Sequence, residues 1–110
     1  MMNKLTEDSD RERYIMKSGI KPGVMEEILR YAGDFGLKKV ILFGSRARGD
    51  FDRASDIDLA ALGGDIKQFS YTMEEKTSTL LRFDVIDLET DLDIGFREQI
   101  EAEGILLYAE

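Results

Sequence analysis

The chain has 110 residues, 43% of them hydrophobic, and contains neither cysteine nor histidine. This length suits one domain with a modest core, so we expect one functional site. Disulfides and the usual zinc ligands are excluded. Any bound metal must therefore be held by oxygen, which favours Mg²⁺, Mn²⁺ or Ca²⁺.

Negative charge dominates the sequence, with 15 Lys and Arg against 23 Asp and Glu and a formal net charge of -8 at pH 7. We therefore expect no binding of long nucleic acid by this domain alone. No segment approaches the ~20 apolar residues that a membrane-spanning helix needs, and the N-terminus is too charged for a secretory signal. These features predict a cytoplasmic protein with no membrane attachment.

The N-terminal part, residues 1–20, is polar and predicts a tail or a short helix, and the domain itself is expected at residues 21–110. Apolar residues at helical spacing predict a helix at residues 22–35, because proline is tolerated in a first turn and Gly36 follows as a stop. The apolar run at residues 40–43 predicts a strand buried on both faces.

A second strand is predicted at residues 56–61, where polar and apolar residues alternate. Asp56 and Asp58 then project from one face of the strand. Ile57 and Leu59 project from the opposite, packed face.

The remaining elements are a helix at residues 66–81, a strand at 83–88, a helix at 92–103 and a strand at 105–108. In the strand at 83–88, Asp84 shares its face with the apolar residues two and four positions on. The predicted buried set of the helix at 66–81 is Ile66, Phe69, Met73, Leu80 and Leu81.

The segment at residues 44–60 carries the strongest chemical signal. A Gly44-Ser45 pair at a strand end opens into a turn or a helix N-terminus, where free N–H groups and the serine hydroxyl point at an anion such as phosphate. Arg46 and Arg48 are candidates for charge-assisted contacts to phosphate oxygens.

Asp56 and Asp58 lie roughly 6 to 7 Å apart on a strand that rises ~3.3 Å per residue, so their side chains can converge on one hard cation. Without a cation the two carboxylates would repel each other. If a neighbouring strand brings Asp84 alongside, three carboxylates can hold two Mg²⁺ ions ~3.5 to 4 Å apart for an in-line displacement at phosphorus. Asp84 is then the candidate to accept the proton of the attacking hydroxyl, whereas Asp87, the competing third acid, falls on the opposite face.

Taken singly, each signal is more typical of a turn or of a solvated strand face than of a functional site. The ordered combination of glycine, serine, two arginines, a second glycine and an acid pair between two apolar runs favours function. Simple Ca²⁺ binding is disfavoured, because the acids lack the loop spacing of an EF-hand.

The segments Gly44-Ser45-Arg46-Ala47-Arg48-Gly49 and Ser55-Asp56-Ile57-Asp58-Leu59 resemble the signature of nucleotidyltransferases with a DNA polymerase β-like fold. They are most similar to minimal nucleotidyltransferases (MNT), in which Gly-Ser-x-Ala-Arg-Gly precedes Ser-Asp-x-Asp-Leu. The resemblance extends over about residues 22–108 and includes a third acid on a later strand, matched by Asp84.

The resemblance implies an α+β fold, a small mixed sheet flanked by helices, in which Gly44 and Ser45 grip a triphosphate. Asp56 and Asp58 would coordinate Mg²⁺, and Asp84 would complete the triad. MNT proteins of this size look like antitoxins of two-gene modules whose other member is a HEPN-domain toxin. The chain would then transfer AMP from ATP, or from another NTP, to a tyrosine hydroxyl of that partner.

Two other functions stay open at this point. The chain could be a non-catalytic antitoxin that sequesters a basic partner by charge, or the catalytic subunit of a nucleotidyltransferase that acts on a small molecule such as an aminoglycoside. In each case the short chain shows no second lobe, so we expect a homo- or hetero-oligomer to complete the substrate site. No motif specifies the nucleobase.

Overall fold

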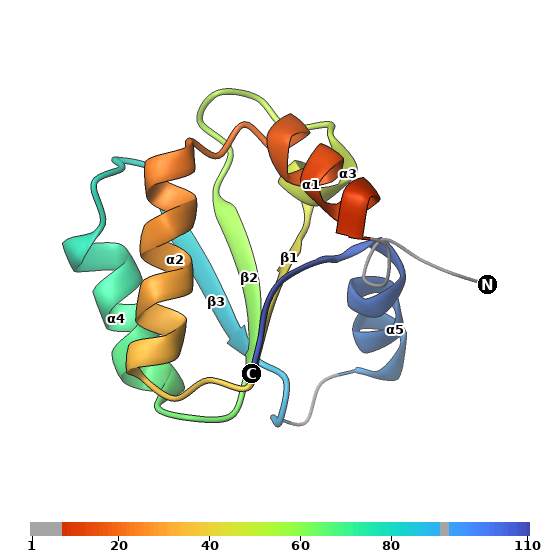
Figure 1. The fold of residues 1–110 in the computed structure, drawn as a ribbon. Helices are drawn as coiled ribbons and strands as arrows, with labels where there is room; N and C mark the ends of the chain where they lie inside the picture. Colours follow the sequence, from red (N-terminus) through yellow and green to blue (C-terminus); the bar gives the residue numbers. More distant parts are fainter. Residues whose placement is uncertain (1–7, 91–92) are drawn as a thin grey trace.

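The computed structural model describes residues 8–90 and 93–110, which form five helices and four strands. One mixed sheet has the strand order β3-β2-β1-β4. The fold is therefore α+β, as predicted (Figure 1). Along the chain the elements are α1 (Asp8–Lys17), α2 (Pro22–Asp34), β1 (Lys39–Phe43), α3 (Ser45–Arg48), β2 (Ile57–Leu62), α4 (Ile66–Lys76), β3 (Phe83–Asp87), α5 (Ile94–Glu103) and β4 (Ile105–Ala109).

Helices lie on both faces of the sheet, with α2 and α4 on one side and α5 on the other (Figure 1). Successive side chains of a strand point to opposite faces, so β2 contributes to two cores. Ile57, Leu59 and Ala61 join the larger core under α2 and α4. Ala60 joins the smaller one with Ile100 of α5.

The sheet topology brings the ends of three strands together at one end of the sheet, which we call the edge. β1 is antiparallel to β2, with Phe43 opposite Asp58, and β2 is parallel to β3, with Asp58 opposite Asp84. The end of β1 therefore lies beside the beginnings of β2 and β3. Residues that follow β1 or begin the other two strands meet at this edge.

The helix predicted at residues 66–81 is shorter in the structure. α4 ends at Lys76, and Thr77 follows in an extended conformation, with its hydroxyl donating a hydrogen bond to the Met73 carbonyl at 2.8 Å. Phe69 and Met73 are buried as predicted. Burial of Leu80 was a wrong prediction, because this side chain lies in the loop after the helix and is fully exposed. Ile66 and Leu81 are only partly buried.

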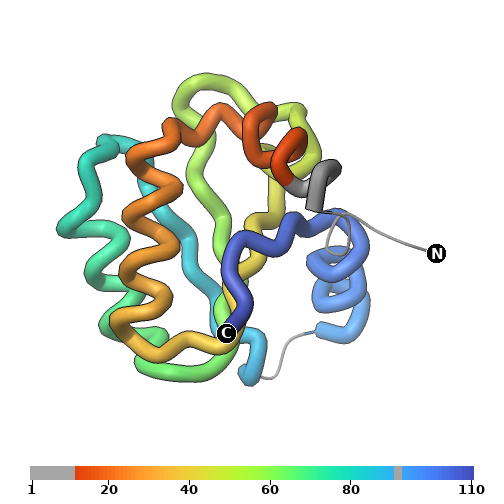
Figure 2. The backbone as a smooth tube through the Cα atoms, viewed as in Figure 1, coloured from red at the N-terminus to blue at the C-terminus, as the bar shows by residue number. Residues whose placement is uncertain are grey.

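A helix, α1, occupies part of the segment predicted to be a tail or a short helix. It lies near α3 and β4 (Figure 2). At the other end of the chain, the predicted helix start at residue 92 lies outside the described residues, and α5 begins at Ile94. Within residues 8–90 and 93–110 no helix is long and apolar enough to cross a membrane. The cytoplasmic location stays a prediction.

Candidate active site

Three carboxylates lie at the edge where the strands meet. Asp58 is half-buried in β2 and stands directly opposite the exposed Asp84 of β3. Asp56 immediately precedes β2 and is exposed. Parity places Asp58 and Asp84 on the face that carries Ala60 and Ile86, which is the face under α5.

The environment of Asp58 disfavours its negative charge. Burial is the largest cause that raises the pKa of this carboxyl above its usual value, followed by the charges of Asp84 and Asp56. Arg48 and Arg46 lower the pKa of Asp58 by smaller amounts and do not cancel the effect. A cation between the acids would relieve this repulsion.

The donor chemistry fits Mg²⁺, because a half-buried carboxylate with two exposed ones beside it offers oxygen ligands to a hard cation. In the described part of the chain no three acidic side chains already converge as a metal-binding cluster. Asp56 and Asp84 are exposed, so their side chains can turn toward Asp58 without disturbing the core. The metal-ligand role of the three aspartates stays a prediction.

Gly44 packs directly against Asp58. Its φ of 76° and ψ of -157° form a conformation that residues with a side chain rarely adopt. An added Cβ would also collide with Oδ2 of Asp58. Gly44 precedes α3, a helix of four residues in which the third and fourth N–H groups donate to the Gly44 carbonyl at 3.1 and 3.0 Å, so the first two are the ones left for an anion. Ser45 and these N–H groups therefore follow directly on the glycine that touches Asp58.

The two arginines of the motif have different environments. Arg48 is exposed, and its Nε donates to Oδ2 of Asp50 at 3.2 Å. Such a surface pair is worth about 0 to 1 kcal/mol, so Arg48 can leave it for a phosphate. Arg46 is only 2% exposed, and its guanidinium donates to backbone carbonyl oxygens, among them that of Ser55 at 3.1 Å. The hydrogen bonds of Arg46 thus go to the protein backbone, which argues against the phosphate contact expected from the motif.

Asp87, the competing third acid, lies at the far end of β3 opposite Ala61. Its Oδ1 accepts a hydrogen bond from the Glu89 N–H at 2.8 Å in the turn that follows the strand. The side chain therefore stabilises a turn, away from the edge where Asp58 and Asp84 meet.

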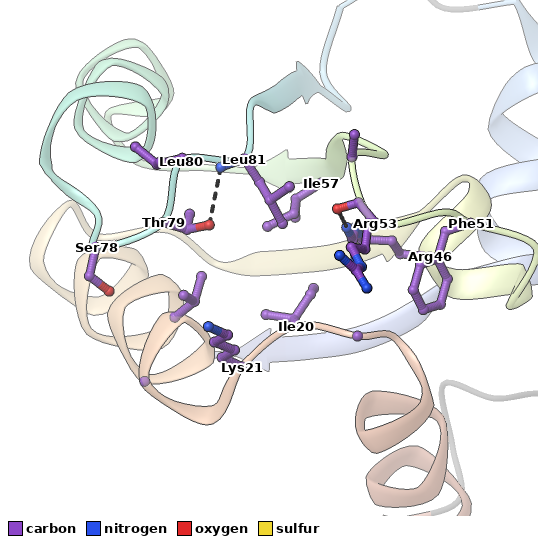
Figure 3. Close-up of a pocket in the computed structure, with 14 residues that line it drawn as sticks. Ile20, Lys21, Arg46, Phe51, Arg53, Ile57, Ser78, Thr79, Leu80 and Leu81 are labelled. Atoms are coloured by element: carbon purple, nitrogen blue, oxygen red, sulfur yellow. Dashed lines mark hydrogen bonds between the residues drawn. The ribbon is translucent and has the colours of Figure 1, made fainter.

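Figure 3 shows the residues that line a cavity of about 920 Å³. Ile57 lines it, and the side chain of this residue points away from Asp56 and Asp58. Its other walls come from residues 19–24, which lead into α2, from Arg46 of α3 and from the loops before β2 and β3. A smaller cleft of about 110 Å³ lies next to Gly44. Phe43 and Phe96 line it and pack edge to face, with their ring centroids 5.9 Å apart.

A glycine-serine turn beside acids on two strands is typical of enzymes that transfer phosphoryl or nucleotidyl groups. The model of the family described as "Polymerase beta, Nucleotidyltransferase" matches residues 26–110. The chain belongs to this family, and it is a nucleotidyltransferase.

Known proteins resemble the chain in sequence and in fold. A Methanocaldococcus jannaschii protein named as a candidate protein adenylyltransferase is 46% identical over 81 residues, which cover 66% of this chain and 79% of the relative. A crystal structure of a toxin–antitoxin pair with AMP-PNP has a TM-score of 0.62 and 25% identity, covering 78% of this chain and 73% of that chain. A tri-AMPylated Shewanella oneidensis HEPN toxin in complex with an MNT antitoxin has a TM-score of 0.55 and 22% identity, covering 79% and 71% of the two chains, which shows a shared fold. The resemblance to MNT-type nucleotidyltransferases that the sequence motifs indicate is confirmed.

Proposed function

We propose that this chain is a Mg²⁺-dependent adenylyltransferase that acts as an antitoxin by moving AMP from ATP to a tyrosine hydroxyl of a HEPN-domain toxin. The observation that carries the proposal is the pairing of Asp58 with Asp84 next to the Gly44-Ser45 turn. The name of the 46% identical relative supports a protein as the acceptor. The AMP-PNP in the toxin–antitoxin structure supports ATP as the donor.

Each residue at the edge has a role in this reaction. Ser45 and the first N–H groups of α3 bind the phosphates of ATP, and Arg48 adds a charge-assisted contact after leaving Asp50. Asp56, Asp58 and Asp84 supply the ligands of Mg²⁺, which when bound neutralises charge on the triphosphate.

Asp84 also accepts the proton of the acceptor hydroxyl. Its exposure allows a side chain from a partner to reach it, and it stands opposite the half-buried Asp58. As the hydroxyl oxygen bonds to the α-phosphorus, the bond to pyrophosphate breaks and the proton passes to the Asp84 carboxylate. The products are the nucleotidylated hydroxyl and pyrophosphate.

The acceptor is expected on another chain. The net charge of -8 favours a basic partner, because complementary charge speeds encounter and selects the partner. A HEPN protein bound at the strand ends where Asp58 and Asp84 lie would bring its tyrosine to Asp84. The same charge underlies the competing function, in which the chain neutralises its partner by binding alone.

The experiment incubates the protein with α-labelled ATP, Mg²⁺ and the HEPN protein encoded nearby. Asp58→Asn and Asp84→Asn are the test variants. Asp87→Asn is the matched control, because it removes the same charge from β3 at the other end of the strand. We expect labelled partner with wild type and Asp87→Asn, at least about a hundredfold less with the other two, and no label in EDTA.

The other outcomes separate the alternatives. A stable wild-type complex that gains no label would refute the catalytic proposal, and neutralisation that survives Asp58→Asn would favour sequestration. Label found only on an added aminoglycoside would identify a small-molecule nucleotidyltransferase. Equal loss of label in Asp84→Asn and Asp87→Asn would remove the special role of Asp84.

A further inference from the structure

Arg46 of α3 connects two other segments of the chain through its guanidinium, the link between α1 and α2 and the loop of residues 50–56. Nη1 donates to the carbonyl oxygen of Ser18 at 2.9 Å, Nε to that of Ser55 at 3.1 Å, and Nη2 to that of Arg53 at 3.4 Å. The guanidinium also lies 4.7 Å from the centroid of the Phe51 ring. Figure 3 shows Arg46 beside Phe51 and Arg53 at one end of the large cavity.

The loop that carries Asp56, residues 50–56, has little packing of its own. Its side chains are exposed or half-buried, and three of its residues border the cavity of about 920 Å³. Asp52 and Ser55 hold the turn together, since the Asp52 N–H donates to Oγ of Ser55 at 2.9 Å and the Ser55 N–H donates to the Asp52 carbonyl at 3.2 Å. These local bonds fix the shape of the turn, but they do not tie it to the rest of the domain.

The other end of the connection is the segment between α1 and α2. Ser18 is fully buried, and its Oγ donates to the Ile15 carbonyl at 2.6 Å and accepts from the Ile20 N–H at 3.3 Å. These bonds fix the backbone carbonyl that receives Arg46. Ser18 lies before residues 26–110, so this anchor precedes the region that the family model matches.

Gly19 closes the backbone over the guanidinium. Its φ is +75°, and an added Cβ would lie 2.6 Å from Cε2 of Phe51 and 2.8 Å from Nη1 of Arg46. No side chain fits between this backbone and Arg46. The segment is therefore seated directly on the arginine and its stacked ring.

Water cannot replace the hydrogen bonds of Arg46 if they are lost. The side chain is 2% exposed, so carbonyl oxygens replace the water that the guanidinium has lost. Lysine would keep the charge, but a single ammonium group cannot reproduce the planar fork that reaches Ser18 and Ser55 together.

We propose that Arg46 is a positioning residue that, anchored on Ser18, holds the loop of residues 50–56 and thereby Asp56 in place for catalysis. Asp56 directly follows Ser55, so a shift of the held carbonyl moves the carboxylate. A misplacement of about 1 Å in a catalytic arrangement can reduce the rate by about a hundredfold. In this role Arg46 acts through the loop and needs no contact with the nucleotide.

The test compares wild type with Arg46→Met, Arg46→Lys and Gly19→Ala. Gly23→Ala is the control, because a Cβ on Gly23 in α2 meets no atom within 4 Å. Hydrogen–deuterium exchange is followed in peptides over residues 50–56 and 94–103, without nucleotide or partner. The transfer reaction of the proposed function then gives kcat and the KM for ATP.

Arg46→Met is expected to speed exchange at residues 50–56 by at least about tenfold and to leave residues 94–103 within about twofold of wild type. Its kcat should fall at least about tenfold while the KM for ATP changes less than about twofold. Gly19→Ala should give the same pattern from outside the catalytic edge. Arg46→Lys should be intermediate, and Gly23→Ala should match wild type.

Three results would overturn the proposal. A raised KM for ATP with unchanged exchange would mean that Arg46 binds the nucleotide. Faster exchange over the whole chain in Arg46→Met would mean that Arg46 only stabilises the fold in general. Wild-type exchange rates at residues 50–56 in Gly19→Ala would show that the segment at Ser18 does not anchor Arg46. This variant tests the proposal even if Arg46→Met does not fold. The exchange measurement needs no acceptor protein. Absence of transfer to a HEPN protein would therefore refute the proposed function, while the exchange rates would still test whether Arg46 holds the loop.

Discussion

Replacing Gly44 by alanine is expected to separate the stability of the domain from its activity. Gly44 has a φ of 76° and a ψ of -157°, and an L-residue in such a region costs about 1 to 3 kcal/mol. In a domain near this size, a change of about 1 kcal/mol moves Tm by roughly 4 °C. Gly44→Ala should therefore unfold roughly 4 to 12 °C below wild type.

The same substitution should remove activity by a different route. The new Cβ would collide with the carboxylate of Asp58, which is the end of a side chain and can turn away without moving the backbone. The fold then survives, but the Asp58 carboxylate points in another direction. We expect transfer to fall at least about a hundredfold at temperatures where the variant is folded.

Gly49→Ala is the matched control. Gly49 has a φ of 94°, so alanine is strained there too, but its Cβ would meet no atom within 4 Å. Thermal unfolding by circular dichroism and the transfer assay below both Tm values compare the two variants. Equal losses of activity, or wild-type activity in folded Gly44→Ala, would refute the idea that the packing of Gly44 on Asp58 matters for catalysis.

Asp58→Asn should stabilise the ligand-free protein at pH 7 by about 0.2 to 1 kcal/mol in urea unfolding, because like charges opposite one another in a sheet are destabilising. The folded-state pKa of Asp58 is raised by burial, Asp84 and Asp56, so its contribution to stability is present below the unfolded pKa and is lost as the pH rises through the folded pKa. Wild type and Asp58→Asn should therefore have similar stability in acid and diverge as the pH rises; a constant difference would contradict the repulsion. Phe69→Ala should cost about 3 to 5 kcal/mol in calorimetry, since the Phe69 side chain is fully buried; a smaller loss would mean that the core under α4 collapses around the vacancy.

The alternation of side chains in strands was sufficient to predict on which face of the sheet each residue of the candidate site lies. Ile57 and Leu59 had to be buried, so Asp58 had to point to the other face. The same parity separated Asp84 from Asp87. The register of β3 against β2 was not predictable, because it depends on how α4 and its loops pack, and the pairing of Asp58 with Asp84 came from the structure.

Leu80 shows why helical spacing overestimated the length of α4. Leu80 and Leu81 continue the apolar period, but the Thr77 hydroxyl bonds to the Met73 carbonyl and the backbone at Thr77 is extended. Side-chain bonds of this kind compete with the helix and leave no apolar signal.

Arg46 shows the corresponding limit for a motif. The sequence places two arginines after the Gly44-Ser45 turn and does not distinguish them, although one is exposed and the other is 2% exposed. The difference arises from carbonyl oxygens of segments on either side of the motif, and carbonyls are present at every residue. No pattern of residue types could have selected Ser18 as the partner of Arg46.

The direction of β1 explains why the motif is compact in sequence. Because β1 is antiparallel to β2, the residue that ends β1 lies at the beginning of β2, and the short helix α3 and one loop are enough to join Gly44 to Asp56. A parallel pair would place Gly44 and Asp58 at opposite edges and would need a crossover between them. The crossover occurs one strand later, through α4, where it sets Asp84 beside Asp58. A short connection therefore places the turn and the acid pair side by side. Within it, the loop of residues 50–56 has little packing of its own, which is why its position depends on Arg46.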